Sequence, residues 1–308
     1  AEFCIHARNC FDAELDPKHG GDAFKVEIVR DGAEVKPTMK DNGDGDYQPT
    51  DGDYPGYDLD GVVDCKSKFR TDPIPLFGDE NLWWVFNDKG NVHTETGGQP
   101  IGMEIRAQAF AFSTNDEVNN MTFYKYQIIN RSTLTLTQTY FGQWVDPDLG
   151  NATDDYVGCD VARGLGFCYN GDADDETQSG YGLNPPAQGI YFLNQTLTNS
   201  IAFDNINNLP TGNPSTCSDY FNLLQSIWLD NQPLTYGEAG RNFANQVCNY
   251  IFPGTTDPVN YPISGAWDET IAGNPPGDRR ILGSIGPFTL APGEVLTFDV
   301  GNRSEERR

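Results

Sequence analysis

Apolar and polar side chains alternate along several stretches of the chain, and this period of two constrains the fold more than any other feature. Between residues 101 and 112, Met103 and Ile105 fall on one face, with Glu104 and Arg106 on the other. Successive side chains of a β-strand point to opposite faces of the sheet, so this pattern predicts a half-buried strand.

Other stretches repeat the pattern with the Thr, Tyr, Phe and Ile content that favours pleated structure. We expect strands at Phe24–Ile28, Met121–Ile129, Leu134–Val145, Phe288–Leu290 and Val295–Val300. The second and third of these are predicted to form a long hairpin through residues 130–132. Ala291-Pro292-Gly293-Glu294 predicts a type II turn, because Gly accepts the positive φ required at the third position.

Only one stretch has helical periodicity. Between Ser218 and Leu229, Tyr220, Leu224 and Ile227 fall on one stripe, and Ser218 is the expected N-cap. The fold class is therefore all-β: a β-sandwich, jelly-roll or immunoglobulin-like, with long loops and one short helix. We divide the chain into an N-terminal strand and disulfide loop (1–40), a β-sandwich domain with acidic loops (41–301) and a tail (302–308).

The charge balance limits the possible partners. The 308 residues include 45 acidic and 20 basic side chains, a net charge of −25. Nucleic acid is an improbable ligand, because phosphate binding requires a basic footprint. A bare anionic membrane surface is disfavoured for the same reason. No apolar run reaches the length of a membrane span.

The acidic residues cluster in two segments, the first of which runs from Asp41 to Asp64 without any Lys or Arg. Two carboxylates about 5 Å apart repel by roughly 3 kcal/mol at an effective dielectric near 20, so an ordered loop of this kind requires a cation. Calcium prefers clustered oxygen ligands in tight turns. The candidate ligands are Asn42, Asp44, Asp46, Asp51, Asp53, Asp58, Asp60 and Asp64. The alternative is an open, solvated acidic loop.

The second acidic segment starts where the strand Leu134–Val145 ends, a position at which sheet loops commonly carry sites. Its candidate calcium ligands are Asp146, Asp148, Asp154, Asp155 and Asp160. The alternative here is an acidic rim without a bound ion.

Seven cysteines with only three histidines and no Cys-x-x-Cys argue against zinc and favour disulfides in an oxidising compartment. The spacing is compatible with Cys159–Cys168 across a hairpin, Cys217–Cys248 around the helix and Cys4–Cys10 in a small loop, with Cys65 left over. Connectivity does not follow from sequence, so these pairings are hypotheses. We expect a secreted or cell-surface protein.

Motifs for nucleophilic, zinc-dependent, phosphate-binding or dinucleotide chemistry are absent from the sequence, so we expect no catalytic residues. A carboxylate pair for glycoside hydrolysis stays an alternative, since 45 acids offer many pairs and geometry alone selects one. The aromatic side chains could pack in the core or form a stacking platform for sugars. The platform candidates are Trp83, Trp84, Tyr140, Trp144 and Trp228.

Several long segments resemble large extracellular proteins of the Bacteroidota that the type IX secretion system exports. They are NGDGDYQPTDGDYP, LWWVFNDKGNVHTETGGQPIGMEI, FGQWVDPDLGNATDDYVGCDVARGLGFCYNGD and GDRRILGSIGPFTLAPGE, within residues 41–301. The resemblance implies export, surface association and β-sandwich architecture. Proteins of this kind normally continue into a sorting domain, which this sequence does not contain. It is therefore either a piece of a longer protein or a repeating subunit.

These observations together predict a calcium-binding structural or adhesive module outside the cell, with self-association into a filament or sheath as one form of that role. The alternative from another class is a carbohydrate-binding module that recognises an extracellular glycan, and less favoured still is a secreted glycoside hydrolase. The expected cofactor is Ca²⁺.

Overall fold

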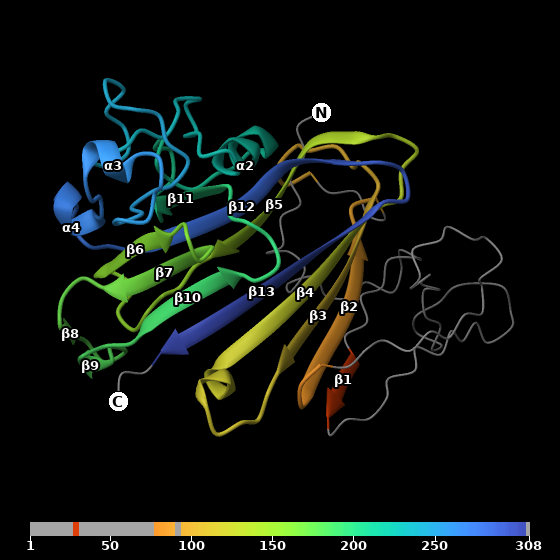
Figure 1. The fold of residues 1–308 in the computed structure, drawn as a ribbon, viewed down its shortest axis with the longest axis horizontal. Coiled ribbons are helices and arrows are strands. Elements are labelled where there is room, and N and C mark those ends of the chain that lie inside the picture. The colour runs from red at the N-terminus through yellow and green to blue at the C-terminus, as the bar shows by residue number, and fades with distance from the viewer. Residues whose placement is uncertain (1–26, 31–76, 90–93, 306–308) are drawn as a thin grey trace, which may run out of the picture.

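The computed structural model describes residues 27–30, 77–89 and 94–305, and these form an all-β fold of two packed antiparallel sheets (Figure 1). The larger sheet has eight strands in the order β1-β2-β3-β4-β13-β10-β7-β6, and the smaller has three in the order β11-β12-β5. The predicted sandwich-like architecture is therefore confirmed. Residues 41–64 and the cysteines Cys4, Cys10 and Cys65 lie outside the described residues.

The strands of the larger sheet are β1 (Glu27–Arg30), β2 (Glu80–Asn87), β3 (Met103–Ala111), β4 (Met121–Asn130), β6 (Asp155–Asp160), β7 (Leu165–Asn170), β10 (Ala187–Phe192) and β13 (Val295–Glu305). Those of the smaller sheet are β5 (Leu136–Val145), β11 (Asn199–Asp204) and β12 (Arg279–Leu290). The short strands β8 (Asp174–Asp175) and β9 (Gly182–Leu183) pair with each other. The helices are η2 (Glu117–Asn120), α2 (Cys217–Leu223), α3 (Tyr261–Ser264) and α4 (Glu269–Ala272).

Apolar side chains from both sheets meet between them in one core. Phe141 of β5 stacks on Phe298 of β13 with ring centroids 4.3 Å apart, and Ile105 and Ile285 belong to the same buried cluster. This is the packing that alternating strands predict when one face is apolar. The strand expected within residues 101–112 is confirmed as β3, but it is not half-buried, because Arg106 and Gln108 on its polar face are buried as well.

The second core lies around a loop-rich segment, residues 205–278, that carries α2, α3 and α4 and lies beside β11 and β12 (Figure 1). Its buried centre includes Trp228 and Trp267, whose indole N–H groups donate to the backbone oxygens of Gly240 (3.0 Å) and Glu238 (2.9 Å). Long polar loops are thus held in place by buried aromatic anchors whose polar atoms are satisfied.

The predicted hairpin between β4 and β5 is wrong, because these strands belong to different sheets. Asn130, fully buried at the end of β4, donates from its side-chain amide to the carbonyls of Leu134 (2.7 Å) and Leu290 (3.0 Å). These two hydrogen bonds link the two chain segments that cross from one sheet to the other, the segment from β4 to β5 and the segment from β12 to β13. Pairing with β12 takes β5 away from β4.

The type II turn before β13 is confirmed in conformation. Gly293 has φ 78°, and the N–H of Glu294 donates to the carbonyl of Ala291 at 3.0 Å. The turn nevertheless connects the two sheets instead of neighbouring strands. Residues 302–305, predicted as the start of a tail, are the last residues of β13.

The predicted helix at Ser218–Leu229 is α2, but both of its ends differ from the prediction. Its N-cap is Thr216, and a capping box with Asp219 closes the first turn. It ends at Leu223, because Ser226 adopts the left-handed region at φ 56° and Ile227 pairs with Pro233 in a β-bridge.

The predicted disulfides within the described residues are also wrong: Cys159, Cys168, Cys217 and Cys248 are buried free thiols. In the β6–β7 pair, Cys159 lies opposite Gly166 while Cys168 lies opposite Val157, so the two cysteines are out of register with each other. A disulfide needs two facing Cβ atoms about 3.8 Å apart.

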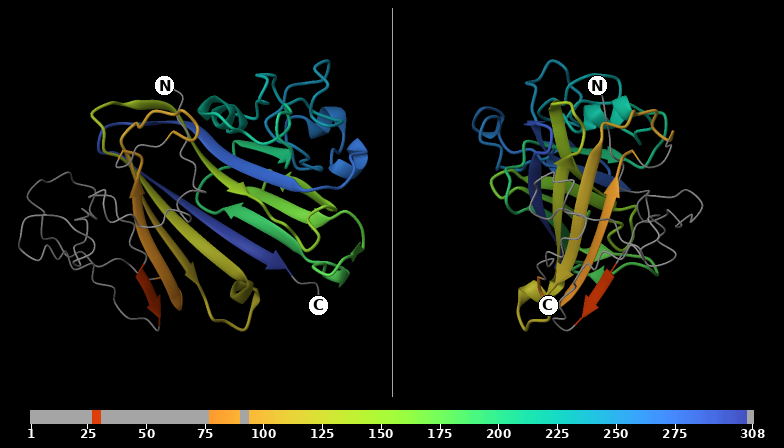
Figure 2. Two further views of the ribbon diagram at one scale, coloured as in Figure 1. Left: turned by 180° about the vertical axis from the view of Figure 1, so that it is seen from behind. Right: turned by 90° about the vertical axis from the view of Figure 1, so that its right-hand side faces the viewer.

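Figure 2 shows the molecule from two further directions and makes clear that the larger sheet extends beyond the smaller one on the side of β1–β4. Within the described residues, no helix has the length and apolar composition needed to cross a bilayer.

Candidate metal site and the acidic end of the sheets

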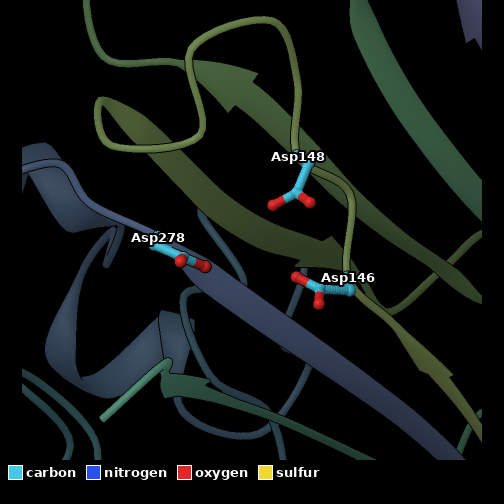
Figure 3. Close-up of side chains that lie close together, drawn as sticks. All are labelled: Asp146, Asp148 and Asp278. Atoms are coloured by element: carbon cyan, nitrogen blue, oxygen red, sulfur yellow. The ribbon is translucent and has the colours of Figure 1, made fainter.

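Three carboxylates converge where the smaller sheet ends, and we call them the Asp146 site: Asp146, Asp148 and Asp278 (Figure 3). Asp146 directly follows β5, and Asp278 directly precedes β12. Because β5 and β12 are antiparallel, with Val145 opposite Ile281, the end of one strand lies beside the start of the other. Each residue offers one oxygen, and these three atoms all lie within 4.8 Å of one another.

Arg280 already binds two of the three carboxylates. Its guanidinium donates to Asp146 Oδ2 and to Asp278 Oδ1, both at 2.8 Å, and its side chain is buried. The side-chain amide of Asn205 donates to Asp278 Oδ2 at 2.8 Å. Three carboxylates and one guanidinium leave two negative charges if all are ionised. Burial raises the pKa of Asp146, and the neighbouring Asp148 and Asp278 raise it further, against the lowering effect of Arg280.

Two oxygens of the site stand out as potential metal ligands. Asp146 Oδ1 is buried and has no hydrogen-bond donor in the described part of the chain, and Asp148 is exposed. Calcium takes six to eight oxygen ligands with flexible geometry, whereas zinc prefers nitrogen and sulfur. The donor set therefore fits a hard cation such as Ca²⁺, with water supplying several ligands.

Asp154 at the end of the same loop and Asp155 at the start of β6 form a second polar group with Asn170 and Asp175. Asp155 and Asn170 are opposite each other in the β6–β7 pair, so their side chains share a face. Asp155 Oδ2 accepts from the N–H of Leu149 at 3.1 Å. One oxygen each of Asp154, Asp155 and Asn170 is buried without a hydrogen-bond donor among the described residues.

Burial changes the ionisation of this second group. It raises the pKa of Asp155 from 3.8 to about 7, and the charges of Asp154 and Asp175 act in the same direction. Burial likewise raises the pKa of Asp154. Asp175 is different, because the backbone N–H groups of Asn151 (3.0 Å) and Tyr181 (2.9 Å) satisfy its two oxygens. Its carboxylate ties the β5–β6 loop to the β8–β9 region.

Asp160, the remaining candidate, lies at the other end of β6 from Asp155. Its carboxylate accepts from the backbone N–H of Arg163 at 3.1 Å and pairs with the guanidinium of the same residue. It holds the β6–β7 turn and is not brought to the Asp146 site. The ligands proposed within residues 41–64 lie outside the described residues.

Sequence reasoning missed Asp278 and Asn170. Asp278 lies more than a hundred residues from Asp146 and is brought there by the β5–β12 pairing, whereas Asn170 reaches Asp155 across the β6–β7 hairpin. The one available signal for Asp278 is its position directly before a strand-forming run in GDRRILGSI.

Two of the five aromatic residues considered for a sugar platform lie in the core. Trp84 and Trp228 are buried, at 9% and 1% exposure, and cannot present a face to a sugar. Tyr140 and Trp144 instead line a cavity of about 710 Å³ beside β5.

Comparison of the sequence with models of known protein families, and with curated proteins, finds no match.

Proposed function

We propose that this protein is a calcium-binding β-sandwich domain with a structural or adhesive role outside the cell. The observation that carries the calcium part is the Asp146 site, where three carboxylate oxygens lie within 4.8 Å of one another and Asp146 Oδ1 is buried without a donor in the described chain.

Electrostatics explains why a cation suits this position. At an effective dielectric near 20, two carboxylates 4.8 Å apart repel by about 3.5 kcal/mol. Arg280 offsets part of that repulsion through its bonds to Asp146 and Asp278. A divalent ion bridging Asp146 Oδ1 and Asp148 would neutralise the remaining charge.

We expect the affinity to be modest. Both oxygens of Asp278 are already engaged, which leaves few protein ligands, and the nearby guanidinium repels a cation. Dissociation constants of about 10⁻⁴–10⁻³ M are usual for extracellular calcium modules. Such a site is filled where calcium is millimolar, and it would then stiffen the loop between β5 and β6.

The resemblance to exported Bacteroidota proteins supports the location outside the cell and the adhesive role, and the acidic composition is compatible with both. The disulfide argument for an oxidising compartment is lost for the described cysteines, which are free thiols. Self-association and glycan recognition stay predictions from the sequence.

The test is calcium titration by calorimetry, together with thermal unfolding in calcium and in chelator. For a dissociation constant of about 1 mM, roughly 10 mM calcium stabilises the folded state by about 1.4 kcal/mol. The melting temperature should then rise by roughly 2–3 °C.

Asp148→Asn should abolish most of that rise, because it removes the exposed charged ligand. The backbone of Asp148 has φ 39°, a conformation that Asn also tolerates, so the fold should survive the change. Glu95→Gln is the matched control, since Glu95 is exposed and the change also removes one negative charge away from the site. The calcium proposal fails if the wild type shows neither heat nor a shift, or if both variants respond alike.

A further inference from the structure

Two neighbouring strands of the larger sheet meet at a pair of buried polar side chains. Asp155 begins β6 and Asn170 ends β7, and the two residues lie directly opposite each other, so their side chains share one face. Two residues away on that same face lie Val157 and Cys168, which belong to the buried core. Asp155 and Asn170 therefore point into the interior, where the two residues are 1% and 6% exposed.

Each of these two side chains has an oxygen that no described residue satisfies. Oδ1 of Asp155 and Oδ1 of Asn170 are buried and accept no hydrogen bond within the described part of the chain. The other oxygen of Asp155 accepts from the N–H of Leu149 at 3.1 Å. The amide nitrogen of Asn170 donates to the carbonyls of Asp172 and Asp174, at 3.4 and 3.3 Å. Both of its hydrogens are therefore engaged, and none is left for Asp155.

The surrounding side chains add negative charge and weak donors only. Asp154 contributes a third buried oxygen, its Oδ1, that has no donor among the described residues. The charges of Asp154 and Asp175 both act on Asp155. Burial is the largest influence on the pKa of Asp155 and raises it, whereas the nearby thiol of Cys168 is a smaller influence that lowers it. One S–H group is a weak donor and cannot serve three oxygens.

The chain around these oxygens is held by short backbone hydrogen bonds. The N–H of Gly171 donates to the carbonyl of Asp154 at 2.7 Å, and the N–H of Gly277 donates to the carbonyl of Asp155 at 2.9 Å. A Cβ at Gly171 would lie 2.7 Å from the first of these carbonyl oxygens and 2.9 Å from Pro276, so the turn is closely packed. Ligand oxygens on such a turn are positioned before any ion arrives.

We propose that Asp155, Asn170 and Asp154 hold a calcium ion at this end of β6 and β7, as a second site separate from the Asp146 site. Their three unsatisfied oxygens can only accept, which is what a cation requires of its ligands. A buried water could donate to two of the three and would leave the negative charge uncompensated. Calcium accepts carboxylate and amide oxygens in flexible geometry, whereas magnesium demands an octahedron and retains its water.

This second site lies at the opposite end of the β5–β6 loop from the first. The loop leaves β5 at Asp146 and enters β6 at Asp155, and the N–H of Leu149 within it donates to the Asp155 carboxylate. Two ions would therefore fix both ends of one loop. The inference goes beyond the proposed function, and it depends neither on calcium at the Asp146 site nor on the adhesive role.

The test is calcium titration of the full chain by calorimetry after treatment with chelator, in an Asp148→Asn background that disables the Asp146 site. We expect this background still to bind calcium. Adding Asp155→Asn should weaken one bound ion per chain at least tenfold, because a charged ligand is lost. Glu176→Gln is the matched control, since Glu176 is exposed and acts on Asp154 only through its charge. In the same background it should change the affinity less than threefold.

Asn170→Asp provides a second variant of nearly the same shape. It keeps an oxygen at the site and adds a negative charge, so the Asp148→Asn background should bind calcium at least as tightly with this change as without it. In chelator the added charge has no counterion, and the melting temperature should fall. A variant that merely disturbed the fold would lose calcium binding as well, and that result would contradict the assignment of Asn170 as a ligand.

The proposal is overturned if Asp148→Asn binds no calcium, or if adding Asp155→Asn changes neither the number of bound ions nor their affinity. It is also overturned if Asp155→Asn raises the melting temperature in chelator while the background shows no calcium binding, since a proton or a water would then occupy the pair. If Asp155→Asn removes one ion and Asp148→Asn binds calcium like the wild type, this site stands and the Asp146 site fails.

Discussion

Asp155 is the residue whose environment most changes its chemistry. Its side chain is 1% exposed, and its Oδ1 has no donor in the described structure. Asp154 and Asp175 add negative charge nearby, and the pKa rises to about 7. Near neutral pH this carboxyl therefore exchanges a proton instead of remaining a permanent anion.

The raised pKa predicts how stability depends on pH in the absence of calcium. The folded protein binds the Asp155 proton more tightly than the unfolded chain, in which the pKa is near 3.8. The free energy of unfolding should therefore rise as pH falls from about 8 towards 4, by up to about 4 kcal/mol from this group. Urea unfolding at several pH values in chelator measures this change.

Asp155→Asn should remove this dependence, because the amide resembles the protonated acid. At pH 8 the variant should be more stable than the wild type by a few kcal/mol, and near pH 5 the two should be similar. Glu95→Gln, on the exposed surface, should keep the wild-type slope. Parallel curves for wild type and Asp155→Asn would show that another group controls the pH dependence.

For single residues, the sequence predicts part of the acidic cluster that follows β5. Asp146, Asp148, Asp154 and Asp155 follow one another after a recognisable strand, so their proximity could be inferred. Asp278 could not be found in the same way, because its approach depends on the pairing of two strands more than a hundred residues apart.

The start of α2 can be tested at the scale of the element. Thr216 accepts a hydrogen bond from the N–H of Asp219 at 3.2 Å, and the carboxylate of Asp219 accepts from the N–H of Thr216 at 2.8 Å. Thr216→Ala should cost about 1 kcal/mol of stability. Ser218→Ala is the matched control, since Ser218 lies inside the helix and should change stability little. Chemical denaturation distinguishes the two, and a larger loss for Ser218→Ala would contradict this N-cap assignment.

Strand prediction succeeds where apolar and polar residues alternate along the sequence, and it fails where a buried strand shows no such alternation. β3, β4 and β5 alternate clearly and were predicted within a few residues. All six residues of β6 are buried, so Asp155–Asp160 offers no alternation to detect. The early part of β12 was missed for the same reason, because Arg280, Ile281 and Leu282 are all buried and this part of the strand shows no alternation.

Across the whole molecule, the aromatic contact between Phe141 and Phe298 joins the two sheets. Phe298 is 2% exposed and also contacts Phe288 at 5.7 Å. Phe298→Ala should destabilise the protein by about 3–5 kcal/mol through lost burial and a cavity. Leu183→Ala, at a side chain 75% exposed, should stay within about 0.5 kcal/mol of wild type. Urea unfolding compares them; a small loss for Phe298→Ala would mean that the sheets do not depend on this contact.

The arrangement of the sheets is the part of the fold that the sequence predicts least. Alternation identifies strands but carries no information on which strands pair, so neighbours along the chain were assigned to a hairpin. The side chain of Asn130 favours a different connection. Its hydrogen bonds to Leu134 and Leu290 stabilise a chain that passes from one sheet to the other after β4. In the sequence alone, this buried asparagine looks the same as the many Asn residues that lie in exposed turns.

The position of β13 has a consequence for how the molecule is assembled. This strand comes last along the described chain, yet it lies between β4 and β10 and connects two halves of the larger sheet that share no other ladder. Until Val295–Glu305 takes its place, both halves would expose an unpaired edge to the surroundings. A ribosome must therefore synthesise nearly the whole of this region before the sheet can close, and the waiting intermediate is the form that a chaperone would have to protect.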